Sequence, residues 1–375
     1  MDKFLERAGG LKAELSAFLH SGRYDRKLRA LVAEVGHHSG ETAELYFGLT
    51  LEGFMLSAKL PGGDTVVEQF IHSRRDLSAE DRDLLLSWRD NVQGIFEIKA
   101  RDGDDGLVLF NHVDELTYTA RSNMGAQGLA GLGPGMILIQ RIVPLGQEWM
   151  MSGPGARFPA DQAEQVLAGL PQLMAGHPEA VFRNPAKLAE ARAMQDEQRQ
   201  AFIELHGSDL VVVAGAEVRE TLLAFYRHVY EKAGSKAGPW TDPGLQPLPE
   251  EWAHADSVAM IYDEIDGLGF YLDYALAQDA FADPDLVVRQ PYRQIISGYL
   301  REDAVSPVPL QRLAAADPAK ASLLFAKILK KRGFIWERDG EALLRRYKSD
   351  WYDNPPPPRI TPVPGPMAER YRAAK

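Results

Sequence analysis

The spacing of apolar residues changes along this 375-residue chain, and the change restricts the folds that it can adopt. Between residues 94 and 152 apolar side chains alternate with polar ones in five short segments, which is typical of half-buried β-strands. They are GIFEIKA (94–100), GLVLF (106–110), ELTYTA (115–120), GMILIQRIV (135–143) and EWMMS (148–152). Aspartate and glycine in DGDDG suit a hairpin turn between the first two strands. Five antiparallel strands of this length usually curl into a small barrel.

Helical spacing comes before and after this β module. Ser78, three residues before Asp81, is a typical helix N-cap, and Asn184 followed by Pro185 is another. The helix that Ser78 begins carries one apolar stripe, formed by Leu84, Leu85, Trp88 and Val92. Most of the chain outside the β module is therefore expected to be helical.

Two later segments predict an apolar strand followed directly by a helix. They are DLVVVAG (209–215) with the helical segment after it, and SVAMIYDEIDGLGFYLDYALAQDAF (257–281). A Gly/Pro-rich linker lies between them, but their strands could share one sheet, so the linker need not separate independent domains. The chain as a whole predicts an α+β fold, mostly helical, with a small five-stranded antiparallel barrel-like module and a second small sheet.

The expected organisation has six parts. They are an N-terminal helical region (1–92), the β module (93–155), a helical region with one strand (156–233), the linker (234–250), a strand–helix and then helical C-terminal region (251–352), and a Pro-rich tail (353–375). Four consecutive prolines, Pro355 to Pro358, prevent helix or sheet in that tail. The tail could dock a partner, be disordered, or lie along the protein's own surface.

Composition excludes several functional classes. The chain has no cysteine, which excludes disulfides, thiolate zinc sites and cysteine nucleophiles. Its formal charge of −11 disfavours nucleic acid and anionic membranes as partners of the whole surface. Neither a signal peptide nor a run of about 18 apolar residues is evident. We therefore expect a cytoplasmic protein of bacterial type, with no membrane partner and no cofactor.

Several segments resemble a group of uncharacterised bacterial proteins, some of which end in a small SEC-C zinc-binding tail. The resemblance rests on LSAEDRDLLLSWRDNVQGIFEI (77–98), VDELTYTARSN (113–123), GMILIQRIVPLGQEWMMSG (135–153) and IYDEIDGLGFYLDY (261–274). It covers about residues 67–155 and 257–285. These are packing patterns, and the cysteines of a SEC-C tail are absent, so the resemblance implies an architecture and no zinc site.

The glycine-rich stretch GAQGLAGLGPGMILIQ (125–140) raises the possibility of a phosphate-binding loop. Such a loop lies between a strand and a helix N-terminus, whereas this one joins two expected strands. We interpret it as a flexible connector. A mobile flap over a ligand surface on the barrel is the alternative.

Three acids are the main candidates for a metal site. Asp263, Glu264 and Asp266 follow the strand SVAMIY and could hold a magnesium ion through carboxylate oxygens. The simpler interpretation is that they cap the helix expected to follow. His37 and His38, with Glu41 nearby, are a weaker candidate pair. The chain has no H-E-x-x-H or G-x-S-x-G motif.

Residues 317–352 are the one basic segment, with nine Lys or Arg against five acids. Cations interleaved with aromatic residues suit phosphate contact combined with base stacking. Cations near helix ends also stabilise the helix dipole, which is the structural explanation. The candidate contacts are Lys327, Lys330, Lys331, Arg332, Trp336, Arg345 and Arg346.

These observations predict a non-enzymatic binding or interaction protein that uses the small β module, with an unidentified protein partner. The first alternative is a metal-dependent or hydrolase-like enzyme with a site near Asp263, Glu264 and Asp266 and a distant histidine. The second is nucleic-acid binding through residues 327–348.

Overall fold

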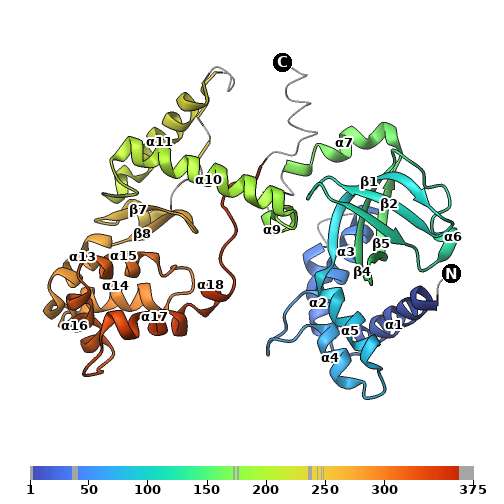
Figure 1. Cartoon of the computed structure of the whole chain (residues 1–375), viewed down its shortest axis with the longest axis horizontal. Helices are drawn as coiled ribbons and strands as arrows, with labels where there is room; N and C mark the ends of the chain where they lie inside the picture. The colour runs from blue at the N-terminus through green and yellow to red at the C-terminus, as the bar shows by residue number, and fades with distance from the viewer. Residues whose placement is uncertain are drawn as a thin grey trace. The chain divides into compact units, whose positions relative to one another are not determined.

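The computed structural model describes residues 3–35, 41–171, 174, 177–234, 239–242, 244–245, 247 and 249–362. The chain forms two compact units, residues 1–187 and residues 188–362, which Figure 1 shows with the element labels used below. The fold is α+β, as expected. No helix among the described residues has the length and apolar character that a membrane span requires.

Helices form the first part of unit 1. They are α1 (Lys3–Leu19), α2 (Asp25–Val35), α3 (Glu41–Leu56), α4 (Val66–Ser73) and α5 (Ala79–Ser87). The Ser78 hydroxyl accepts a hydrogen bond from the Asp81 N–H, which confirms the predicted N-cap. Leu84, Leu85 and Trp88 are buried as the stripe predicted, but Val92 already belongs to the first strand. The helices pack their apolar faces against one side of the β module through Val143, Leu145 and Met150.

The β module has five strands and closes on itself. The strands are β1 (Val92–Asp102), β2 (Gly106–Asn111), β3 (Thr117–Arg121), β4 (Ile137–Leu145) and β5 (Glu148–Phe158), paired in the order β1-β2-β3-β5-β4 and back to β1. The prediction of purely antiparallel pairing is wrong for β3 and β5, which are parallel. An odd number of strands that alternate in direction cannot close without one parallel pair.

The glycine-rich stretch between β3 and β4 packs against residues of the barrel. It forms the short helix α6 (Gly125–Gly128), and after it Leu129 and Leu132 are buried with the barrel-interior residues. The Arg101 guanidinium donates to the carbonyls of both leucines, at 2.6 and 2.9 Å. The stretch connects two strands, as expected, and it is packed and hydrogen-bonded at Leu129 and Leu132. Its flexibility stays a prediction.

Short helices follow the barrel, and the long helix α10 then leads into unit 2. These are α7 (Ala163–Leu167), α9 (Pro178–Val181) and α10 (Pro185–His206). The Asn184 side chain accepts from the Ala186 N–H at 3.0 Å, so the predicted start of α10 is confirmed.

Unit 2 combines a three-stranded sheet with helices. Its elements are β6 (Leu210–Val213), α11 (Val218–Ala233), α12 (Glu250–Ala253), β7 (Val258–Asp263), β8 (Gly267–Leu272), α13 (Tyr274–Ala282), α14 (Gln290–Arg301), α15 (Val308–Ala316), α16 (Pro318–Ile328), α17 (Trp336–Tyr347) and α18 (Ser349–Asp353), with a 3-10 helix η5 (Pro284–Val288). The sheet order is β6-β7-β8, and both pairs are antiparallel. Strands on either side of residues 234–250 thus share one sheet.

The segment after β7 differs from the prediction. A second strand, β8, follows β7 through a tight turn, where a helix was expected to begin directly. Gly267, with φ of +67°, occupies the left-handed region that lets the chain reverse. The helix α13 begins only after β8.

The first part of the Pro-rich tail lies along unit 2. The Pro356 carbonyl accepts from Arg192 at 3.1 Å. The Arg359 side chain donates to the Asp266 carbonyl at 2.7 Å, and its N–H donates to Gln195 at 3.1 Å. Residues 355–362 therefore follow the protein's own surface. The rest of the tail, from residue 363, lies outside the described residues.

Candidate functional site

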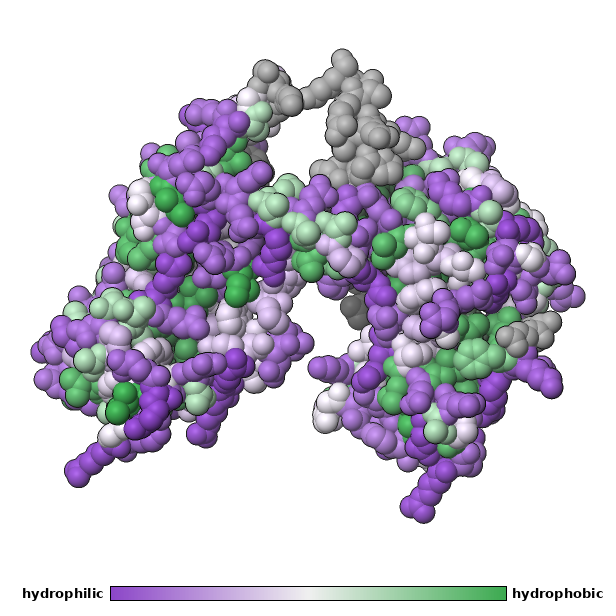
Figure 2. Space-filling model, in the orientation of Figure 1, coloured by the Kyte–Doolittle hydropathy of each residue, from purple (hydrophilic) through white to green (hydrophobic). Residues whose placement is uncertain are grey.

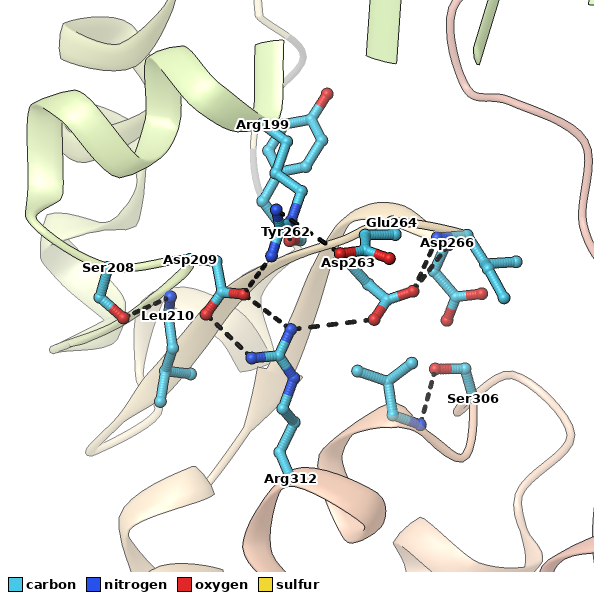
Figure 3. A network of polar contacts seen from close by, with 12 residues as sticks. Arg199, Ser208, Asp209, Leu210, Tyr262, Asp263, Glu264, Asp266, Ser306 and Arg312 are labelled. Carbon is cyan, nitrogen blue, oxygen red and sulfur yellow. Dashed lines mark hydrogen bonds and ion pairs between the residues drawn. The ribbon is translucent and has the colours of Figure 1, made fainter. Parts of the chain in front are cut away.

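Of the three candidate metal ligands, Asp263 ends β7, and Glu264 and Asp266 lie in the turn that leads to β8 (Figure 3). One carboxylate oxygen of Asp263 accepts the N–H groups of Ile265 and Asp266, at 2.8 and 3.2 Å. An oxygen of Asp266 accepts the Trp351 indole N–H at 2.6 Å. The Glu264 side chain is 74% exposed and lies 3.7 Å from Arg199. Asp263 and Asp266 therefore stabilise the turn and its contact with α18.

The charge next to this turn is balanced by arginine. Arg312 on α15 donates to both oxygens of Asp209, at 2.9 and 2.8 Å, and Arg199 on α10 donates to one of them at 2.7 Å (Figure 3). Arg312 also lies 3.9 Å from Asp263. Burial raises the pKa of Asp209, but the hydrogen bonds from Arg312 and Arg199 outweigh it, and the net pKa is below its ordinary value. Asp209 joins the helices α10 and α15 to the start of β6.

The described residues contain no group of three or more His, Asp or Glu side chains placed to hold a metal ion. His37 and His38 lie outside those residues, and nothing is described of the Glu41 side chain. A metal or hydrolytic site at Asp263, Glu264 and Asp266 stays a prediction. The oxygens of Asp263 and Asp266 that accept the hydrogen bonds given above are already engaged, so a metal would have to use the other oxygens.

We expect millimolar Mg²⁺ or Mn²⁺ to leave the melting temperature unchanged, because Asp263 and Asp266 already accept hydrogen bonds from the turn and from Trp351. A metal that binds only the folded state would raise that temperature by mass action. Differential scanning fluorimetry with and without each metal checks this. A concentration-dependent rise that Asp263→Asn abolishes would instead support a metal site.

The basic segment divides into paired and unpaired cations. Lys327 forms an ion pair with Asp285, and Arg345 donates to Glu341 at 2.9 Å. The Trp336 ring stacks on Phe325, with 4.9 Å between centroids. These three candidate contacts are engaged within the protein.

Three other candidates come together in an open groove of about 460 Å³ between α14, the end of α16 and α17. Lys330, Lys331 and Arg346 line it, together with Arg301 at the end of α14. We call this the basic groove. Its remaining lining is Ile328, Leu329, Phe334, Asp339, Ala342, Leu343 and Tyr347. Arg332 is exposed next to the groove and does not line it.

The cations of the basic groove are largely uncompensated. Arg301, Lys330 and Arg346 are exposed, and no acidic side chain of the described residues forms an ion pair with them. The guanidiniums of Arg301 and Arg346 lie 5.8 and 5.7 Å from the centre of the Tyr347 ring. Lys331 is 4.0 Å from Asp339, the one acid of the lining. Four cations and one acid leave the lining with an excess of positive charge, which an anion would balance.

Lys330 occupies a position that normally favours glycine. It follows the C-cap of α16 with φ of +52°, and the Lys331 N–H donates to the Ala326 carbonyl at 3.0 Å, as in a Schellman motif. A lysine here costs backbone strain that glycine would avoid. A residue that breaks a local preference at a charged groove is a candidate for function.

Sequence reasoning missed Arg301. It is a lone arginine in the last turn of α14, far from the basic segment along the chain. No local pattern distinguishes it from a cation that stabilises a helix end. Only the packing of α14 beside α17 brings it to Arg346 and Tyr347.

The predicted interaction surface on the β module stays a prediction. On the outside of β1 and β2, Lys99 lies 5.2 Å from the centre of the half-buried Phe110 ring, and the His112 ring contacts its edge. Figure 2 shows hydrophilic residues over much of the visible surface of both units, with hydrophobic residues in smaller groups.

A buried ionic group fixes the helices of unit 1 to the barrel. Lys12 on α1 and Glu52 on α3 form an ion pair at 2.6 Å, with both side chains 10% exposed. The Ser152 hydroxyl on β5 donates to the same Glu52 oxygen at 2.8 Å. Burial lowers the pKa of Lys12, while Glu52 opposes that shift. The group spans three elements and is structural.

Comparison of the chain with protein-family models, curated protein sequences and solved structures gave no match. The resemblance to the SEC-C-associated bacterial proteins therefore stays a prediction. The candidate site rests on its own geometry.

Proposed function

We propose that the protein is a non-enzymatic binding protein that takes an anionic ligand in the basic groove. The observation that carries the proposal is the convergence of Arg301, Lys330 and Arg346 without acidic partners. Guanidinium and ammonium groups bind carboxylates and phosphates by charge-assisted hydrogen bonds, which are about twice as strong as neutral ones. An anion in the groove would relieve the repulsion among these cations.

The charge distribution of the chain supports the same proposal. The net charge is −11, so a local basic site stands out against an acidic background. Such a contrast directs an anion to the site and disfavours binding elsewhere on the surface.

Charge reversal in the groove tests the proposal. We expect Arg301→Glu, Lys330→Glu and Arg346→Glu together to abolish binding of a fluorescein-labelled poly-glutamate at low ionic strength, measured by fluorescence anisotropy. Wild-type binding should weaken as salt is added, because exposed charges are screened. The three side chains are exposed, so the fold should remain intact by circular dichroism.

Two variants separate binding from folding. Lys330→Gly should weaken binding while stabilising the protein by about 0.5 kcal/mol, because relief of left-handed strain exceeds the added flexibility of the unfolded chain. Lys320→Glu reverses one charge, as each substitution of the triple variant does, at the other end of α16, roughly 12 Å of helix from the groove, and should bind like the wild type. Equal binding by the wild type and the triple variant would reject the basic groove as the site.

A further inference from the structure

The floor of the basic groove is apolar. Ile328 and Leu329, at the end of α16, are half-buried, and Leu343 on α17 is buried. The four cations line the same groove. A ligand that contacts both the apolar floor and the cations carries an apolar group as well as negative charge. Covering half-exposed aliphatic surface lowers the free energy of the complex.

The aromatic rings of the groove are already covered by cations. The Lys331 ammonium lies 5.7 Å from the centre of the Phe334 ring, and Phe334 is buried. Arg301 and Arg346 both lie against Tyr347. Base stacking needs a free ring face, so the groove offers phosphate contacts without the stacking that single-stranded nucleic acids use.

The groove is only partly enclosed by the protein. Sites for small molecules usually bury about 70–90% of the ligand, which an open groove does not do. A segment of a protein chain can place one or two side chains in an open groove and make further contacts outside it. The exposed cations of the groove can then pair with acidic residues that flank an apolar side chain of the bound segment.

We infer that the basic groove takes an acidic peptide segment of a partner protein. A leucine-like side chain lies on Ile328, Leu329 and Leu343, and neighbouring carboxylates pair with Arg301, Lys330 and Arg346. This inference rests on the proposed function and adds the class of ligand. It also gives a physical reason for the apolar floor, which anion binding alone does not require.

Three labelled probes of similar charge test the inference on the full chain. They are the peptide EDLLED, the peptide EDSSED and an oligothymidylate. We expect EDLLED to bind about tenfold or more tightly than EDSSED, because a buried leucine side chain contributes at least that factor. Lys330→Gly should weaken both peptides by a similar factor and leave their ratio unchanged, since it removes a charge and keeps the floor.

Three other outcomes would overturn the inference, and they differ in what they imply for the proposed function. Equal affinity for EDLLED and EDSSED would overturn the inference and leave the proposed anion site standing. Tighter binding of the oligothymidylate than of EDLLED would overturn the inference in favour of nucleic acid. Binding of none of the probes would overturn both the inference and the proposed function.

Discussion

Glu52→Ala should destabilise unit 1 by about 3–5 kcal/mol, the cost of leaving one member of a buried ion pair without its partner. Glu52 is the acid that Lys12 contacts, at 2.6 Å, and both side chains are 10% exposed. Without Glu52 the Lys12 ammonium remains buried against α3 and the barrel. Urea unfolding measures the free energy, and hydrogen exchange shows whether the loss is confined to unit 1.

The stability that Glu52→Ala loses should become smaller as the pH rises. Burial already lowers the pKa of Lys12, and removal of Glu52 removes the contact that opposes that shift. The unfolded chain then binds more protons than the folded one between the lowered pKa and the ordinary lysine value. Stability of Glu52→Ala should therefore rise as the pH rises through that interval.

Two variants serve as controls for Glu52→Ala. Ser152→Ala removes only a hydrogen bond to Glu52 and should cost about 1 kcal/mol. Lys12→Met combined with Glu52→Leu removes both charges and should recover most of the lost stability, because apolar residues of similar size often replace a buried ion pair without cost. A loss below about 1 kcal/mol for Glu52→Ala would show that water reaches Lys12.

Asp209→Ala should destabilise unit 2 by about 2 kcal/mol, the value of hydrogen bonds to charged groups reduced for partial exposure. Asp209 is 17% exposed and accepts three hydrogen bonds, from Arg199 and Arg312. Its removal leaves two guanidiniums close together with no acid between them. The loss should appear in the hydrogen exchange of β6, β7 and α15.

Acid should remove the stabilising contribution of Asp209 from the wild-type protein. Because the folded pKa of Asp209 lies below its ordinary value, the stabilisation is complete above about pH 4 and is lost as the pH falls through the lowered pKa. Asp209→Ala should lack this component of the acid transition.

Glu264→Ala, which removes a 74% exposed carboxylate of the neighbouring turn, should change stability by less than about 0.5 kcal/mol. Equal losses for the two variants would contradict the assigned role of Asp209.

The basic groove and the Asp209 network differ in how their charges are balanced. Around Asp209 each arginine meets a carboxylate, so the charges hold helices and strands together. In the basic groove Arg301 and Arg346 lie against the Tyr347 ring, and no acid of the described part of the chain forms an ion pair with them. This difference is why the groove, and not the acidic turn, is the better candidate for a ligand.

Local features of the fold could be read from the sequence. Ser78 and Asn184 cap helices as predicted, because a cap depends on side chains and N–H groups two or three residues apart. The alternation of apolar residues located the barrel strands for the same reason. The segment after Tyr262 was misread: GLGFYL was expected to lead directly into a helix, but it forms a strand by pairing with β7.

The sequence by itself determined the α+β class, the five barrel strands, the caps, the absence of thiol chemistry and the excess of cations in residues 317–352, since these depend on composition and on neighbours along the chain. Tertiary structure alone decided the parallel pairing of β3 with β5, the burial of Leu129 and Leu132, and the meeting of Arg301 with Arg346. Each of these joins residues far apart in the chain. Which distant residues meet is set by the packing of whole elements, and no local pattern encodes it.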